Sequence, residues 1–122
     1  MILVDTSIWI DHLHSTDHVL VERLERLEVG THHWVIAELA LGSMANRDEV
    51  LAALKELWRF PVLDAAEMLA LVDGRRLWSR GLSVVDIHLL GAAALVPGAA
   101  LWTRDKRLIA AGQDLGVTLI AE

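Results

Sequence analysis

Short apolar runs alternate along the chain with longer segments of helical periodicity. Residues 2–4 form an aliphatic, β-branched run that predicts a strand, and the polar residues 5–7 can cap a following helix over 8–13. A second helix is predicted over 17–29, where apolar side chains recur at helical spacing until Gly30. The chain is therefore predicted to begin with one strand and two helices.

The middle of the chain continues the alternation. Residues 32–35 predict a short strand, and the residues through Met44 favour a helix. A further helix over 48–58 is predicted to end before Pro61, because proline cannot continue a helix, and residues 62–63 can then form a strand.

The second half of the chain repeats the pattern. It predicts a helix over 65–80 capped by Asp64, a helix over 84–96 opened by Ser83, a strand over 99–102, a helix over 104–111 closed by Gly112, and a strand over 117–120. Strands that alternate with helices favour a mostly parallel sheet covered by helices on both faces. The predicted fold class is therefore α/β.

Composition limits the class of protein. With 122 residues, of which 54% are apolar, the chain is long enough for a single domain over 1–122 with one core. The longest apolar stretch, 89–102, is too short for a membrane span and contains Pro97 and Gly98. The absence of cysteine excludes disulfides and thiolate metal sites, so we expect a cytoplasmic protein in which any metal is bound by oxygen or imidazole.

Charge is distributed unevenly. The formal net charge of −6 opposes binding to a polyanion. Between Leu71 and Arg107, however, six basic residues accompany three acidic ones, a balance of +3, so the rest of the chain carries −9. The sequence thus predicts a locally positive zone that suits an approaching polyanion, although solvated helix faces would give the same pattern.

Four scattered carboxylates are the candidate chemistry. Asp5 and Asp105 follow strand-like runs, so we expect them at the same edge of the sheet, where open α/β sheets bind ligands. Asp86 lies in the first turn of its helix, and Glu38 lies inside an apolar helix. Clustered carboxylates can bind one or two Mg²⁺ or Mn²⁺ ions, which can support hydrolysis of a phosphodiester.

Each carboxylate also has a structural explanation. Asp5 and Asp105 can simply cap helices, and Ser83 with Asp86 resembles a capping box. Glu38 needs no capping role. It either lies on a solvated helix face or, if buried among its apolar neighbours, requires a partner or a metal.

Four segments of the chain together resemble a known family, the PIN-domain ribonucleases, and in particular the VapC toxins of prokaryotic toxin–antitoxin pairs. The matching segments, which occur in the family's order, are residues 4–10, 37–39, 81–86 and 101–108. The resemblance implies a three-layer α/β/α domain that cuts RNA with Mg²⁺ or Mn²⁺. It also implies a homodimer inhibited by a cognate antitoxin protein.

The resemblance implies roles for individual residues. Asp5 and Asp86 would be the principal metal ligands, with Glu38 and Asp105 completing the acidic, catalytic pocket. By the same match, Thr6 and Thr103 would be supporting residues that orient the carboxylates or bound water. The chain departs from the family at residues 87–88, where relatives usually carry small or aliphatic residues.

Basic and aromatic residues add two further expectations. Arg104, Lys106 and Arg107 flank Asp105 and are predicted to contact RNA. Tryptophans could stack on RNA bases, but their apolar surroundings favour core or interface positions. The five are Trp9, Trp34, Trp58, Trp78 and Trp102, of which Trp9 and Trp58 are candidates for an apolar groove that receives a partner helix.

Two other functions compete with the nuclease. A phosphoacceptor receiver domain has similar length and an acidic Mg²⁺ pocket, and residues 62–63 followed by Asp64 could supply its central aspartate. The expected amino-terminal acidic pair is missing, however, and Lys106 lies inside a predicted helix. A non-catalytic module that kept the fold is the other alternative, and the presence of all four carboxylates disfavours it.

Overall fold

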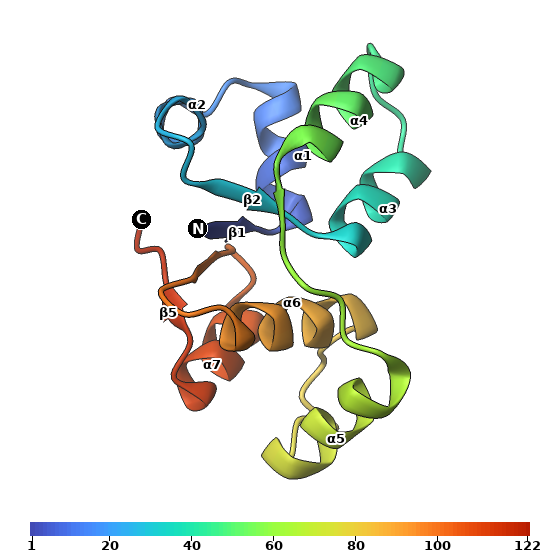
Figure 1. Cartoon of the computed structure of the whole chain (residues 1–122), viewed down its shortest axis with the longest axis vertical. Coiled ribbons are helices and arrows are strands. Elements are labelled where there is room, and N and C mark those ends of the chain that lie inside the picture. Colours follow the sequence, from blue (N-terminus) through green and yellow to red (C-terminus); the bar gives the residue numbers. More distant parts are fainter.

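Strands and helices alternate in the computed structural model, which describes residues 1–122 (Figure 1). In chain order the elements are β1 (Ile2–Val4), α1 (Thr6–His14), α2 (His18–Glu25), β2 (Val29–Thr31), α3 (His33–Leu41), α4 (Arg47–Glu56), β3 (Trp58–Arg59), α5 (Ala65–Arg75), α6 (Val84–Leu95), β4 (Ala100–Trp102), α7 (Lys106–Leu115) and β5 (Thr118–Leu119).

One parallel sheet forms the middle layer. Its strand order is β3-β2-β1-β4-β5, and every pairing in it is parallel. Figure 1 shows α1 to α4 on one side of the sheet and α5 to α7 on the other, which confirms the predicted three-layer α/β/α class. The chain moves outward from β1 through β2 to β3, then returns to pair β4 with the other side of β1. This reversal beside β1 is the position where open α/β sheets form their ligand-binding crevice.

The second strand lies earlier than the sequence predicts. Residues 32–35 were expected to be a strand, but β2 covers Val29–Thr31, and His32 already caps α3. Gly30 was expected to end a helix and instead lies inside β2, where a Cβ would be 2.6 Å from the Phe60 ring. Tertiary packing against this ring explains the glycine better than a helix end does.

The third strand also differs. It covers Trp58–Arg59, whereas residues 62–63 form no strand. Asp64 does cap α5 as predicted, in a capping box with Glu67. Asp64 therefore does not follow a central strand, and the receiver-domain interpretation loses its phosphoacceptor.

The observed helix ends differ from the predicted ones where residues adopt the left-handed conformation. The helix predicted over 17–29 ends at Glu25, shortly before Leu27 (φ 57°), and the helix predicted over 65–80 ends before Arg76 (φ 54°). Conversely, α7 continues through Gly112 to Leu115, and Gly116 (φ 73°), a residue type suited to that conformation, caps its end.

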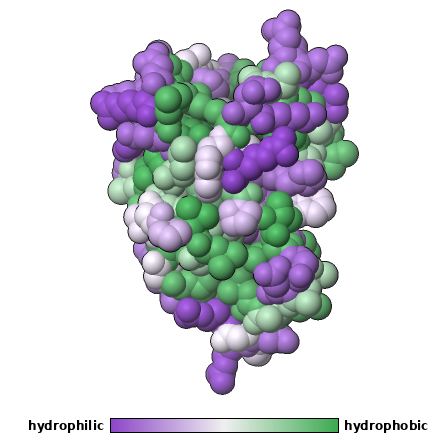
Figure 2. Space-filling model, in the orientation of Figure 1, coloured by the Kyte–Doolittle hydropathy of each residue, from purple (hydrophilic) through white to green (hydrophobic).

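A core of 24 buried hydrophobic residues surrounds the sheet. Of the five tryptophans, only Trp9 and Trp102 are buried, whereas Trp34, Trp58 and Trp78 are exposed. On the face shown in Figure 2, apolar side chains gather over the half occupied by α5 to α7, and polar ones mark the opposite end. None of the helices is long and apolar enough to cross a membrane.

His32 is the buried titratable group that most directly shapes this fold. It is fully buried, and its Nδ1 accepts the backbone N–H of Trp34 at 3.0 Å, so it caps α3 as a neutral ring. Burial, aided by the nearby His88 and His33, lowers the pKa of His32 from 6.5 to about 4. Protonation would both bury a charge and remove the cap acceptor.

The stability of the protein is therefore expected to fall in mild acid. The unfolded state binds a proton at His32 below pH 6.5 while the folded state does not until about pH 4. The free energy of unfolding should thus decrease through this window, by about 3 kcal/mol from this group, and level off below it. Urea denaturation between pH 7.5 and 4 measures the slope. His32→Asn, whose side-chain oxygen can still accept the N–H, should flatten it. An unchanged slope in that variant would refute the assignment.

Candidate active site

Asp5 directly follows β1 and caps α1. Its backbone N–H donates to the carbonyl of Trp102 on β4 at 2.9 Å, which places it beside the end of that strand. Its carboxylate accepts the backbone N–H of Thr6 (2.8 Å) and the hydroxyls of Ser7 (3.2 Å) and Thr103 (2.7 Å). Since Asp5 is buried, these three bonds replace lost hydration. They also fix the orientation of the carboxylate at the boundary between β1 and β4.

Asp105 lies beside Asp5, as predicted from the two strand ends. The Thr103 hydroxyl that donates to Asp5 accepts the backbone N–H of Asp105 at 3.1 Å, so one side chain links both acids. The Oδ1 atom of Asp105 accepts the backbone N–H groups of Arg107 (2.9 Å) and Leu108 (3.3 Å), which caps α7. Asp105 is exposed, and its Oδ2 receives no hydrogen bond from the protein.

Glu38 approaches this edge from α3. Its Oε1 accepts the Thr6 hydroxyl at 2.7 Å, across 32 residues of sequence. Glu38 is exposed rather than buried, so the argument that burial would force a partner on it does not apply. Because Thr6 follows Asp5 directly, its hydroxyl nevertheless ties Glu38 to the same part of the sheet edge. The predicted supporting positions Thr6 and Thr103 each therefore hold a predicted acid.

Asp86 is the third residue of α6 and lies in a capping box. Its Oδ2 accepts the backbone N–H of Ser83 at 2.9 Å, and its own N–H donates to the Ser83 hydroxyl at 3.0 Å. Burial raises the pKa of Asp86 above its usual value. The Ser83 hydrogen bonds oppose this effect, and the negative charges of Asp5 and Asp105 add to it. Asp86 thus shares its electrostatic environment with both of these acids.

The four predicted acids meet at one edge of the sheet to different degrees. Threonine hydroxyls connect Glu38 and Asp105 to the segment that carries Asp5, whereas Asp86 is coupled to the others through charge. No three His, Asp or Glu side chains lie close enough together to hold a metal ion between them. The capping explanations of Asp5, Asp86 and Asp105 are confirmed, and capping leaves oxygens of Asp86 and Asp105 available.

The donor set suits a hard divalent cation. All four candidates offer carboxylate oxygen, the ligand that Mg²⁺ and Mn²⁺ prefer. Mg²⁺ usually retains several waters and binds through one or two carboxylates, so a three-residue cage is not required. Burial is the main cause of the raised pKa of Asp86, and the negative charges of Asp5 and Asp105 raise it further. Asp5 and Asp86 could supply the direct contacts, and Glu38 and Asp105 could bind the coordinated waters.

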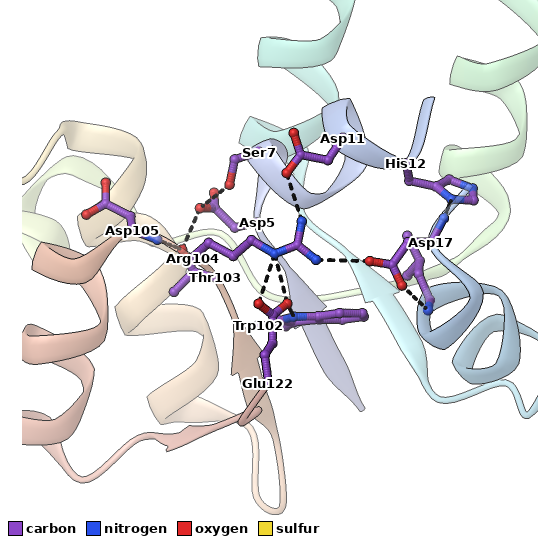
Figure 3. A network of polar contacts seen from close by, with 11 residues as sticks. Asp5, Ser7, Asp11, His12, Asp17, Trp102, Thr103, Arg104, Asp105 and Glu122 are labelled. Atoms are coloured by element: carbon purple, nitrogen blue, oxygen red, sulfur yellow. Dashed lines mark hydrogen bonds and ion pairs between the residues drawn. The ribbon is translucent and has the colours of Figure 1, made fainter. Parts of the chain in front are cut away.

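A second polar cluster adjoins the site (Figure 3). The Arg104 guanidinium contacts Glu122 through Nε (2.9 Å), Asp11 through Nη1 (2.8 Å) and Asp17 through Nη2 (2.9 Å). The indole N–H of Trp102 donates to the same Glu122 carboxylate at 2.7 Å. Arg104 thereby ties the last residue of the chain to α1 and to the start of α2.

The ion pairs of this cluster contribute to the lowered pKa values of Glu122 and Asp17 and occupy Arg104, which was predicted to contact RNA. The pKa of Glu122 is lowered, chiefly by Arg104, and the pKa of Asp17 is lowered by the Leu20 backbone N–H and by Arg104. Arg104 was predicted to contact RNA, but three carboxylates already surround its guanidinium. Lys106 and Arg107 are exposed and form no ion pair, so they remain available.

Sequence reasoning missed two kinds of contact. Ser7 donates to Asp5 and had a local signal, since it lies two residues after the acid within the same capping segment. The partners of Arg104 had none, because Glu122, Asp17 and Asp11 lie 18, 87 and 93 residues away in sequence. Such pairings become visible only once the strands are ordered.

Thr103 is the hydroxyl on which this geometry depends most. Thr103→Val keeps the volume but leaves the buried Asp5 carboxylate without its shortest side-chain donor, so we expect unfolding to cost about 1–3 kcal/mol less. Thr103→Ser keeps the hydroxyl and loses one methyl group. Urea denaturation should therefore rank wild type above Ser and Ser above Val. Equal stabilities for the two variants would show that the hydroxyl contributes little.

Comparisons with known proteins identify the family of the chain. A family model described as PIN domain matches residues 2–113. The chain is 58% identical over 122 residues to the protein named Ribonuclease VapC32 of Mycobacterium tuberculosis strain CDC 1551 / Oshkosh, an alignment that covers 100% of this chain and 98% of that relative. The protein of the same name from strain ATCC 25618 / H37Rv matches with the same identity and coverage. The chain belongs to the PIN-domain family.

Proposed function

We propose that the chain is a metal-dependent endoribonuclease and the toxin of a toxin–antitoxin pair. One observation carries this proposal: Thr103 links Asp5 and Asp105 where β1 and β4 end, and the charges of both acids act on Asp86, in a chain 58% identical to a protein named Ribonuclease VapC32. The receiver-domain alternative is wrong for a member of the PIN family. A non-catalytic module remains disfavoured, because all four acids are present and the hydroxyls of Thr6 and Thr103 bond three of these residues.

The chain's own residues orient the site. Thr103 and Ser7 hold the Asp5 carboxylate, and Thr6 holds Glu38, so that the acids point to one edge before a substrate arrives. Asp5 and Asp86 are the proposed metal ligands, completed by Glu38 and Asp105. When bound, Mg²⁺ or Mn²⁺ supplies charge stabilisation to the phosphate and a water acidic enough to attack it.

Basic residues define the proposed approach of RNA. Lys106 and Arg107 lie in the first turn of α7, directly after Asp105, and neither is paired with a carboxylate. The Arg107 side chain lies over Gly81, in the loop that leads to α6 and Asp86. Both cations thus lie next to the acidic edge, whereas Arg104 is assigned a structural role.

Two protein partners follow from this proposal. A cognate antitoxin is proposed to bind at a groove of about 200 Å³ between the first four helices, lined by nine residues of which eight are hydrophobic, Trp9 and Leu39 among them. Trp58, also predicted for the groove, does not line it. A homodimer is proposed through α5, since this helix contains no buried residue and exposes apolar side chains such as Leu69.

The domain organisation and the cellular location of the protein are also proposed. Residues 1–122 are proposed to act as one PIN-like domain, which the shared core of 24 residues supports. A cytoplasmic location is proposed from the complete lack of cysteine, since secreted domains of this size often depend on disulfides.

Cleavage of RNA by matched variants tests the activity. Purified protein is incubated with total RNA in Mg²⁺, Mn²⁺ or EDTA. Asp5→Asn can retain the cap of α1 but removes a metal-binding charge, so we expect cleavage to fall by about 100-fold or more. Asp64→Asn is the control, because Asp64 caps α5 in the same way outside the site.

The outcomes separate the enzyme from its alternatives. The proposal predicts metal-dependent cleavage by wild type and by Asp64→Asn only. Cleavage that persists in EDTA, or equal activity of the Asp5 and Asp64 variants, would contradict the assigned mechanism.

A further inference from the structure

Trp34 is an exposed aromatic residue whose orientation the protein fixes. It is the second residue of α3 and 39% exposed. The His88 ring lies 5.7 Å from the indole at an interplanar angle of 46°, and the His33 ring lies 6.0 Å away, nearly perpendicular to it. The Trp34 backbone N–H donates to the buried His32. Both backbone and ring are therefore held in place while part of the ring stays open to solvent.

The position of Trp34 connects two helices of the candidate active site. Residues four apart share one helix face, so Trp34 lies one turn before Glu38 on the same side of α3. Its ring contact, His88, lies two residues beyond Asp86 on α6. Figure 1 shows the first turns of α3 and α6 near one another, in agreement with the contacts between these helices. An exposed ring is thus presented one turn from Glu38, on a helix that packs against the helix carrying Asp86.

Because the protein is negatively charged, an exposed aromatic ring would add affinity for RNA that its few cations do not provide. The chain carries a net charge of −6, and few unpaired cations lie near the acidic edge. Phosphate contacts alone would therefore provide little affinity for RNA. Stacking of a base on an aromatic ring adds affinity that does not depend on cations, and unstacked single-stranded RNA offers its bases for it.

We propose that Trp34 stacks on an RNA base adjacent to the phosphate held at the acidic edge, and so positions single-stranded RNA for cleavage. The inference rests on the proposed ribonuclease function. The Trp34 ring contacts two histidines and its backbone N–H is bonded to a third, so the ring loses little conformational freedom on binding, which favours this use. Trp34 would be a substrate-positioning residue with no part in the metal site.

Binding of fluorescent RNA tests the stacking directly. Asp5→Asn protein, used to prevent cleavage, is titrated in Mg²⁺ with 12-nucleotide single-stranded RNAs that carry 2-aminopurine at successive positions. We expect strong quenching at one position. Trp34→Leu in this background should abolish that quenching and weaken binding by about 5- to 100-fold, whereas Trp34→Phe should retain most of both.

Two controls separate stacking from other roles of the residue. Trp58, on the edge strand β3, is similarly exposed, at 45%, but packs edge-on against Phe60, so Trp58→Leu should bind RNA as the parent does. The dependence of affinity on salt should be the same for Trp34→Leu and its parent, because no phosphate contact is lost. Urea denaturation of each variant verifies that it is folded. The quenching at one position is measured first in the parent, in which Trp34 is unchanged, so this observation does not depend on the folding of a Trp34 variant.

Each result decides between defined outcomes. Unchanged binding and quenching in Trp34→Leu, while wild type cleaves RNA, would overturn this inference alone. The same result with weakened binding of a cognate antitoxin would assign Trp34 to a protein interface instead. Failure of wild type to cleave, together with failure of the Asp5→Asn parent to bind any of the RNAs, would overturn both the inference and the proposed function.

Discussion

The hydrogen bond from Thr103 to Asp5 joins the ends of two parallel strands that are almost the whole chain apart. It is 2.7 Å long and buried, and it spans 98 residues of sequence. Val4 pairs with Trp102, so Asp5 and Thr103, which follow them, lie side by side at the ends of β1 and β4. The strand order reverses beside β1, and open α/β sheets bind ligands at such a position. The positions of Asp105 and, through Thr6, of Glu38 depend on this junction.

The acids of the site serve structure and chemistry together. Asp5, Asp86 and Asp105 each satisfy free backbone N–H groups at the start of a helix, which favours a negative charge at that position. Helix starts in a parallel α/β sheet lie at the carboxyl ends of the strands, so caps and ligands are drawn to the same edge. Capping therefore fixes the carboxylates without using all of their oxygens. Capping and the proposed metal binding are compatible interpretations of the same residues.

The features of the structure that local sequence patterns determine could be predicted from the sequence. The first strand, the capping residues Asp5 and Asp64, and the common edge of Asp5 and Asp105 follow from periodicity and from parallel-sheet geometry. The position of β2 does not, because Gly30 marks close packing against Phe60 and not a helix end. Local patterns equally cannot show that Arg104 binds carboxylates distant in sequence, or that Trp34 remains exposed.

The central claim is that the edge formed by β1 and β4 binds a divalent cation through Asp5 and Asp86. Crystals grown with Mn²⁺ test it most directly, because the anomalous signal of the ion locates it without reference to activity. The account predicts one or two peaks bonded to carboxylate oxygens of Asp5 and Asp86, weakened in crystals of Asp5→Asn. Peaks only at other residues, or none in a protein that cleaves RNA, would contradict it.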